Sequence, residues 1–195
     1  MIYYSGIRNS VQQETELILD NINQQEVKTT LQDVVKDCRT VLLGHEASRV
    51  LSAYGIPSCQ VQLATSAKEA GDLSDQLGYP VVLKISSPEI VHKTDVGGVE
   101  IGLQNRQQVE EAFDRIMERA KYHLPDAPLY GVEVSNMADE GTELIIGLTR
   151  DVQFGPLIVF GLGGIYVNLF EDVSFRLASS LTTRKTIEEM ISETN

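Results

Sequence analysis

The sequence lacks a basic excess. It has 16 Lys and Arg against 28 Asp and Glu, which gives a formal net charge of −12 and a pI near 4.6. Nucleic acids and anionic membranes attract net positive surfaces, so this balance argues against a broad interface with either. It still allows a local basic pocket that binds phosphate.

Cysteines and long apolar runs are also scarce. Cys38 and Cys59 are the only two cysteines and form neither a CxxC motif nor a metal-ligand spacing. No apolar run reaches membrane-spanning length, and the opening "MIYYSGIRNS" lacks the basic-then-apolar layout of a secretory signal. We therefore expect a reduced, cytoplasmic protein with no membrane partner.

The first 40 residues differ in character from the rest. They are polar and glutamine-rich, with apolar residues at roughly helical spacing. This pattern predicts one or two amphipathic helices that serve as a linker or docking segment, so we place the domain boundary at residues 40 and 41. The whole chain has 195 residues, of which 42% are hydrophobic. The part after residue 40 is therefore long enough to form a hydrophobic core.

From residue 41 onward, helices and strands alternate, which predicts an α/β or α+β architecture. In "HEASRVLSAYGIPSCQVQLA" we expect a helix with Ala47, Val50 and Leu51 facing inward, then a strand through Cys59 and later apolar residues. Further helices are expected in "TSAKEAGDLSDQLG", with a capping box at its start, and in "RQQVEEAFDRIMERAKYH". Further strands are expected in "YPVVLKI", "LYGVEVSNM", "TELIIGLTRD" and "PLIVFGLGG".

Lys84 interrupts an otherwise apolar strand. A buried cation is costly unless an anion meets it, so two interpretations stay open. The lysine lies on the solvent face of an edge strand, or it binds phosphate. The following "HKTDVGG" supplies Lys93 and two glycines, Gly97 and Gly98, whose backbone N–H groups can approach an anion closely. Two strands joined by such a loop can fold over a polyphosphate.

His92 also has two interpretations. It is a surface histidine without a function, or, beside a phosphate clamp, a neutral imidazole that accepts a phosphoryl group. The local sequence does not decide between them.

Five stretches in register resemble one family. They are "EASRVLSAYGIP", "GYPVVLKISSPEIVHKTDVGGVEIGL", "GVEVSNM", "GTELIIGLTRDVQFGP" and "VFGLGGIYVNLFEDVSFRLA". Together, over roughly residues 42–192, they resemble the ATP-grasp domain of ADP-forming acyl-CoA synthetases, which are related to succinyl-CoA synthetases. Members convert acyl-CoA, ADP and phosphate to the acid, CoA and ATP through an acyl phosphate and a phosphohistidine. The resemblance implies ATP or ADP and Mg²⁺ as cofactors, with CoA bound by another part of the enzyme.

The resemblance also implies roles for individual residues. Lys84 matches a strand lysine that touches the nucleotide phosphates, and His92 matches a histidine implicated as a second phosphoryl carrier. Asp95 is expected to orient that imidazole through a hydrogen bond. The remaining nucleotide contacts are expected from the phosphate-covering loop (Lys93, Gly97, Gly98), the adenine hinge (Ser135, Asn136, Met137) and the acidic Glu143.

The sequence also departs from the family pattern. Asn168 stands where the family commonly has Glu, and Ser135-Asn136 stand in place of Gln-Glu. The Asp-x-Asn-Pro motif that supplies Mg²⁺ ligands in the family is absent, and Glu171 and Asp172 do not make a complete metal site. We therefore assign no metal ligand. We expect a fragment of a longer fused synthetase, with an incomplete second lobe, exposed apolar surface and self-association.

Two functions follow from this resemblance. The first is the nucleotide-handling part of a synthetase, inactive by itself and dependent on a CoA-binding part of the same polypeptide or of a partner subunit. The alternative is a non-catalytic nucleotide-binding module, for example the regulatory synthetase-like region of a protein acyltransferase. An unrelated α/β scaffold would have to match five motifs by accident.

Overall fold

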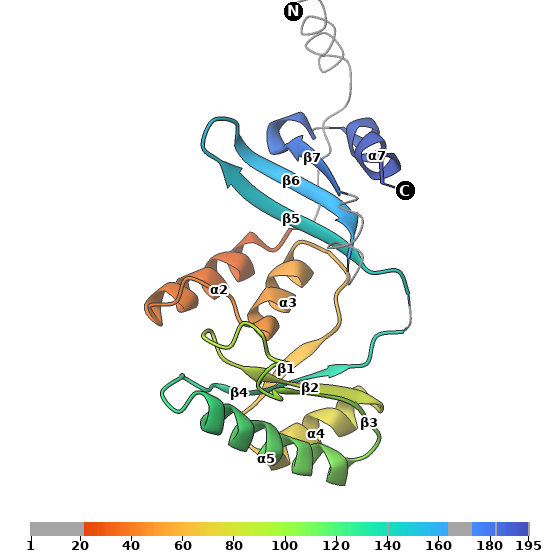
Figure 1. Ribbon diagram of the computed structural model, residues 1–195. Coiled ribbons are helices and arrows are strands. Elements are labelled where there is room, and N and C mark those ends of the chain that lie inside the picture. Colours follow the sequence, from red (N-terminus) through yellow and green to blue (C-terminus); the bar gives the residue numbers. More distant parts are fainter. Residues whose placement is uncertain (1–21, 140, 164–172, 182, 195) are drawn as a thin grey trace, which may run out of the picture. The chain divides into compact units, whose positions relative to one another are not determined.

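A computed structural model describes residues 22–139, 141–163, 173–181 and 183–194 (Figure 1). These residues form two compact units, one that ends at Asp139 and one that begins after it. The first unit contains α2 (Gln24–Lys36), α3 (Gly44–Ala53), β1 (Val61–Ala64), α4 (Ala67–Leu77), β2 (Val81–Ser86), β3 (Val99–Leu103), α5 (Arg106–His123) and β4 (Gly131–Asn136). The second contains β5 (Leu144–Asp151), β6 (Gly155–Leu162), β7 (Val173–Leu177), a short 3-10 helix (Ala178–Ser180) and α7 (Arg184–Ser192).

The first unit is built on a four-stranded sheet with the order β1-β4-β2-β3, in which all neighbouring strands are antiparallel. Helices α4 and α5 pack against each other and against one face of this sheet (Figure 1). The mixed α/β class predicted from the sequence is thus confirmed. The strands β2 and β4 lie in the centre of the sheet, which places the polar residues of both strands away from its edges.

The residues of the two central strands that face α4 and α5 form the core. Val81, Leu83 and Ile85 of β2, and Val132 and Val134 of β4, are fully buried on the face covered by helices. They pack against apolar side chains of α5 that recur at helical spacing, as predicted: Val109, Phe113, Ile116 and Ala120. Because side chains alternate between the two faces of a strand, the residues between them point to the other face of the sheet.

The start and end of α4 follow the sequence signals. Ser66 caps the helix, since its hydroxyl accepts a hydrogen bond from the Glu69 N–H at 3.2 Å. In a capping box the Glu69 carboxylate would accept the N–H of Ser66. Here it accepts the N–H and the hydroxyl of the preceding residue, Thr65, both at 2.7 Å. The helix ends at Gly78, whose φ of +83° favours glycine.

Two details of the expected α3–β1 segment are wrong. Leu51, expected to face inward, is 40% exposed. Cys59, expected in the strand, precedes β1 and is exposed. The side chains of α3 that are buried are instead those of Glu46 and Ala53. A buried charged residue, Glu46, thus lies on the inward face of this short helix. The spacing of apolar residues in the sequence does not predict that.

Helix α2 lies in the segment predicted to be a helical linker. It is capped by the Asn23 side chain and packs against α3. Residues 1–21, which carry the other apolar positions of the predicted amphipathic segment, lie outside the described residues. The boundary between a linker and a domain at residue 40 remains a prediction.

The second unit is a three-stranded antiparallel sheet with the order β5-β6-β7. β5 and β6 were predicted, whereas β7 and α7 were not. Helix α7 packs against β7 and β6, and the Ser174 hydroxyl donates a hydrogen bond to the Met190 carbonyl at 3.0 Å. Arg176 of β7 forms an ion pair with Glu193, which follows α7.

Strand β5 carries an exposed apolar row. Leu144, Ile146 and Leu148 alternate along one face and are all more than half exposed. The expected incomplete lobe and its self-association remain predictions. Among the described residues, no helix is long and apolar enough to cross a membrane.

Candidate functional site

Lys84 lies on the face of the first sheet that α4 and α5 leave uncovered. Its neighbours in the register are Val99 of β3 and Glu133 of β4, so β2 is an interior strand. The edge-strand interpretation of Lys84 is therefore wrong. The side chain is exposed although Leu83 and Ile85 on either side are fully buried. Within the described part of the chain, its ammonium group has no hydrogen-bond or ion-pair partner, so it is available to an anion.

The loop from His92 to Gly98 joins β2 to β3 and is held by its own backbone. The Asp95 N–H donates to the His92 carbonyl at 3.2 Å, and the Gly97 N–H donates to the Thr94 carbonyl at 3.0 Å. The Gly98 N–H donates to the Lys93 carbonyl at 2.8 Å. The two glycine N–H groups that we expected to face an anion are thus engaged within the loop in this structure.

Both glycines are required by the geometry of the loop. Gly97 has a φ of +62°, and a Cβ atom there would lie 2.9 Å from Cδ of Arg119. A Cβ atom at Gly98 would lie 2.5 Å from Cγ2 of Ile85 and 2.9 Å from the Lys93 carbonyl oxygen. The Gly98 carbonyl also accepts the Ile85 N–H at 2.7 Å. Glycine at these positions therefore lets the loop pack closely against β2.

His92 and Asp95 occupy the same exposed turn. The structure brings them together through the backbone bond, but among the described residues no hydrogen bond joins the Asp95 carboxylate to the His92 ring. The orienting bond that we predicted for this pair is absent from the structure. The imidazole of His92 is open to a reaction partner from the solvent side.

Lys93 points the other way, into the sheet. Its Nζ lies 3.3 Å from Oε2 of Glu133, and its side chain is 26% exposed. An ammonium group has three N–H donors, so a lysine bound to one carboxylate oxygen keeps donors for a second anion. Lys93 is thus held in place by the protein while part of its head remains accessible.

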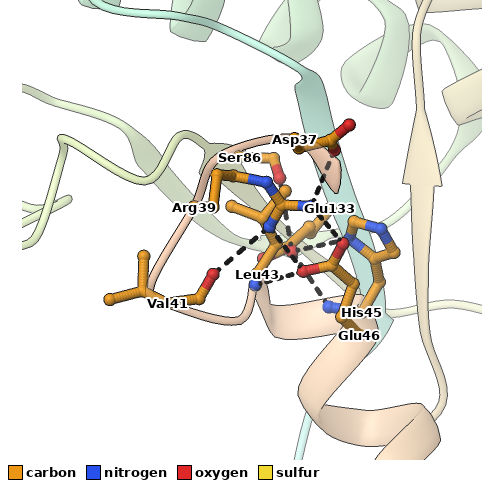
Figure 2. A network of polar contacts seen from close by, with 8 residues as sticks. All are labelled: Asp37, Arg39, Val41, Leu43, His45, Glu46, Ser86 and Glu133. Carbon is orange, nitrogen blue, oxygen red and sulfur yellow. Dashed lines mark hydrogen bonds and ion pairs between the residues drawn. The ribbon is translucent and has the colours of Figure 1, made fainter. Parts of the chain in front are cut away.

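Glu133 is the functional-site candidate that the sequence analysis missed. Its side chain is 4% exposed, and Figure 2 shows two of the groups that meet it, His45 of α3 and Ser86 of β2. Its Oε1 accepts the backbone N–H of His45 at 3.0 Å and lies 3.1 Å from the His45 Nδ1. The Ser86 hydroxyl donates to the same oxygen at 3.4 Å. The sequence does contain a signal for it. Glu133 is a charged residue between two valines in "GVEVSN", just as Lys84 is a charged residue within an apolar strand.

The carboxylate of Glu133 caps the amino end of α3. The cap residue Leu43 has no hydroxyl or carboxylate side chain, so Glu133 from β4 fills this role through the His45 N–H. A Cβ atom at Gly44 would lie 2.5 Å from Oε2 of Glu133, which shows how closely the helix backbone approaches. Burial alone raises the pKa of this carboxyl, but the hydrogen bonds from His45 and the charge of Lys93 outweigh it and lower the pKa to about 2.

A second buried pair holds the same helix end from the other side. Arg39 donates two hydrogen bonds to Glu46, at 2.7 and 2.6 Å, and a third to the Asp37 carboxylate at 3.0 Å (Figure 2). Glu46 also accepts the Leu43 N–H at 2.7 Å. Burial opposes ionisation of Glu46, yet the bonds from Arg39 and Leu43 lower its pKa. The first turn of α3 is therefore fixed by two carboxylates, only one of which also contacts the His92 loop.

The predicted adenine hinge lies at the end of β4. Ser135 pairs with Val61 of β1 and with Val82 of β2, so it is flanked by strands on both sides. The Asn136 amide donates to the Leu77 carbonyl at 2.9 Å, which fixes the end of α4. The Met137 N–H donates to Pro80 at 3.2 Å. The Asn136 side chain thus serves the fold, whereas the Met137 side chain is 46% exposed.

Glu143 belongs to the second unit. It is exposed, immediately precedes β5, and its carbonyl accepts the Gly163 N–H at 2.7 Å. Asn168, Glu171 and Asp172 lie outside the described residues. Among the residues that are described, no three His, Cys, Asp or Glu side chains gather closely enough to hold a metal ion. The described residues therefore identify no Mg²⁺ ligand.

Comparison with known proteins places this arrangement in one family. Residues 33–195 match the ATP-grasp domain family. The chain belongs to the ATP-grasp domain family. The extent of the match includes β2, the His92 loop and β4 as well as the whole second unit.

The ATP-grasp chain is similar to the beta subunit of acetate–CoA ligase (ADP-forming) I from Pyrococcus furiosus, with 47% identity over 152 residues. That match covers 78% of this chain and 65% of the relative, so the chain spans about two thirds of the length of this relative.

Among solved structures, the ATP-grasp chain resembles acetyl-coenzyme A synthetase 1 from Ca. Korarchaeum cryptofilum in complex with coenzyme A and Ca-AMPCP. The TM-score is 0.80 and the identity 46%, over 85% of this chain and 72% of the other. A second structure of that enzyme, with Mg-AMPPCP and a phosphohistidine segment pointing towards the nucleotide binding site, gives a TM-score of 0.71 and 42% identity, over 86% and 70%. The predicted fold is thus confirmed.

Proposed function

We propose that this chain is the nucleotide-handling part of an ADP-forming acyl-CoA synthetase and exchanges a phosphoryl group between ATP or ADP and a phosphohistidine. The observation that carries the proposal is Lys84, an exposed cation without a partner among the described residues, on an interior strand beside the His92 loop. A cation held at such a place by an ordered sheet is suited to the charge of nucleotide phosphates. The relatives that bind nucleotide analogues support the same role.

The overall reaction would convert acyl-CoA, ADP and phosphate to the acid, CoA and ATP. A CoA-binding part, in the same polypeptide or in a partner subunit, would form the acyl phosphate and the first phosphohistidine. We place the enzyme in the cytoplasm, where its two cysteines stay reduced. Mg²⁺ would accompany the nucleotide, with its ligands outside the residues described.

His92 is the proposed acceptor within this chain. In the direction of ATP synthesis, the phosphorus–nitrogen bond of phosphorylated His92 breaks and a terminal oxygen of ADP bonds to the phosphorus. The electron pair of the broken bond stays on the imidazole, which becomes the neutral base again. Lys84, Lys93 and the loop of Gly97 and Gly98 would hold the phosphates, and the backbone from Ser135 to Met137, with Glu143, would contact the nucleoside.

The alternative is a module that binds nucleotide without transferring phosphate. The observation on its side is the absence of a bond between Asp95 and the imidazole among the described residues. The two functions differ in one observable, which is a covalent phosphate on His92.

Labelled phosphate tests the proposal directly. The chain is incubated with MgATP labelled on its γ-phosphate, alongside His92→Asn and, as a matched control, His123→Asn. His123 is another exposed histidine, at the end of α5. Acid-labile label on the wild type and on the control, but not on His92→Asn, is the expected result. Bound nucleotide with no label on His92, also when the CoA-binding part is supplied, would instead support the non-catalytic module.

A further inference from the structure

Glu133 contacts both the amino end of α3 and the loop that carries His92. We infer that Glu133 is a positioning residue that anchors the His92 loop through Lys93, an inference that rests on the proposed function of His92. Glu133 does not touch His92 itself. It acts through the residue next to it in the sequence, whose Nζ lies 3.3 Å from the Glu133 carboxylate.

Lys93 connects the start of the loop both to β4 and to the end of the loop at Gly98. Its side chain reaches β4, and its carbonyl accepts the Gly98 N–H at 2.8 Å. The Gly98 carbonyl in turn accepts the Ile85 N–H from β2. Fixing the head of Lys93 therefore fixes the whole turn against two central strands, with His92 at its start.

Glu133 binds the lysine of the loop and not the lysine of the neighbouring strand. Lys84 lies directly across the strands from Glu133, but among the described residues the carboxylate is bonded to Lys93, His45 and Ser86. Glu133 thus ties down the lysine of the loop and leaves the lysine of the strand available. If Lys93 were unpaired as well, the loop would lose conformational freedom only on binding phosphate, at a cost in affinity and in rate.

The burial of Glu133 makes the anchor strong. A buried carboxylate is costly unless it is paired and hydrogen-bonded, and here one helix N–H, one imidazole, one hydroxyl and one ammonium meet it. Replacement by the neutral amide keeps the shape but weakens every one of these bonds. Glu46 provides a matched comparison, since it is also a buried carboxylate that binds a backbone N–H and a cation at the same helix end, without contacting the loop.

Amide hydrogen exchange in the full 195-residue chain tests the anchor. We compare the wild type with Glu133→Gln, Lys93→Met, the double variant and Glu46→Gln. Both Glu133→Gln and Lys93→Met should raise exchange in residues 92–98 by about tenfold, because each disrupts the charge-assisted bond between Glu133 and Lys93, the only one of the Glu133 contacts described that reaches this loop. The double variant should add little further, since the two changes break the same contact. Glu46→Gln should affect α3 but not the loop.

Several outcomes would overturn the anchor. If Lys93→Met leaves exchange in residues 92–98 unchanged, Glu133 serves α3 alone and the inference fails. If Glu133→Gln raises exchange equally throughout the first sheet, its role is merely one of stability. Should Glu133→Gln not fold, Lys93→Met still decides, because that side chain comes from a loop and not from the core.

A second measurement links the anchor to chemistry. Phosphorylation of His92 by MgATP should slow by about tenfold in Glu133→Gln, while the dissociation constant of the nucleotide changes by less than about threefold because Lys84 is retained. An equal loss of rate and affinity would contradict positioning. If the wild type binds no nucleotide, the proposed function fails, and hydrogen exchange alone then decides whether the anchor exists.

Discussion

Lys84 of β2 and Glu133 of β4 are direct neighbours across two central strands, yet in the described structure they form no ion pair. The carboxylate is turned towards α3 and the His92 loop, and the ammonium group is left exposed. A neighbouring pair of opposite charges would ordinarily stabilise a sheet. Their separation here keeps one cation unneutralised, as a phosphate site requires.

The depressed pKa of Glu133 predicts a pH dependence of stability. Its folded-state pKa of about 2 lies below the ordinary value of 4.5, so the ionised form stabilises the fold. This contribution is fully present above pH 4.5 and is lost as the pH falls towards 2, and it amounts to roughly 3 kcal/mol. Urea unfolding of the wild type and Glu133→Gln at several pH values measures it. The difference between the two should shrink on acidification, and a difference independent of pH would contradict the assignment.

Close packing of the His92 loop predicts that Gly98→Ala destabilises the protein. The new methyl group would lie 2.5 Å from Cγ2 of the buried Ile85 and 2.9 Å from the Lys93 carbonyl. Overpacking of this kind costs about 1–3 kcal/mol. Gly141→Ala, where nothing lies within 4 Å of the added atom, is the control. Thermal unfolding should show a lower midpoint for Gly98→Ala only, and equal midpoints would mean that the loop is not packed as described.

The cap of α4 predicts a smaller effect. The Ser66 hydroxyl accepts the Glu69 N–H, and loss of such a bond costs about 1 kcal/mol. Ser66→Ala should therefore lower the free energy of unfolding by that amount, as measured in urea. Ser66→Asp retains an acceptor and should recover the loss. No recovery in that variant would show that the cap contributes little.

Much of the first sheet can be predicted from the sequence. The alternation in "GVEVSN" places its valines on one face, as does that of Val81, Leu83 and Ile85 in "VVLKIS", and the 3.6-residue spacing in α5 supplies the surface that covers them. These patterns are local, so a single sequence contains them. The same alternation places Lys84 on the opposite face of the sheet.

The partners of the charged residues could not be predicted in this way. Glu133 meets His45 across 88 positions of sequence and Lys93 across 40, and neither spacing carries a local signal. The expected bond from Asp95 to His92 is local, yet the turn joins them through the backbone instead.

Calorimetric titration of MgADP into the chain tests the central claim, that Lys84 holds nucleotide phosphate, most directly. The wild type should bind, and Lys84→Ala should bind about 10- to 100-fold more weakly, because a charge-assisted contact contributes about 1.5–3 kcal/mol. Lys121→Ala, which removes an exposed lysine of α5, should bind within about twofold of the wild type. Equal affinity of the wild type and Lys84→Ala would contradict the account.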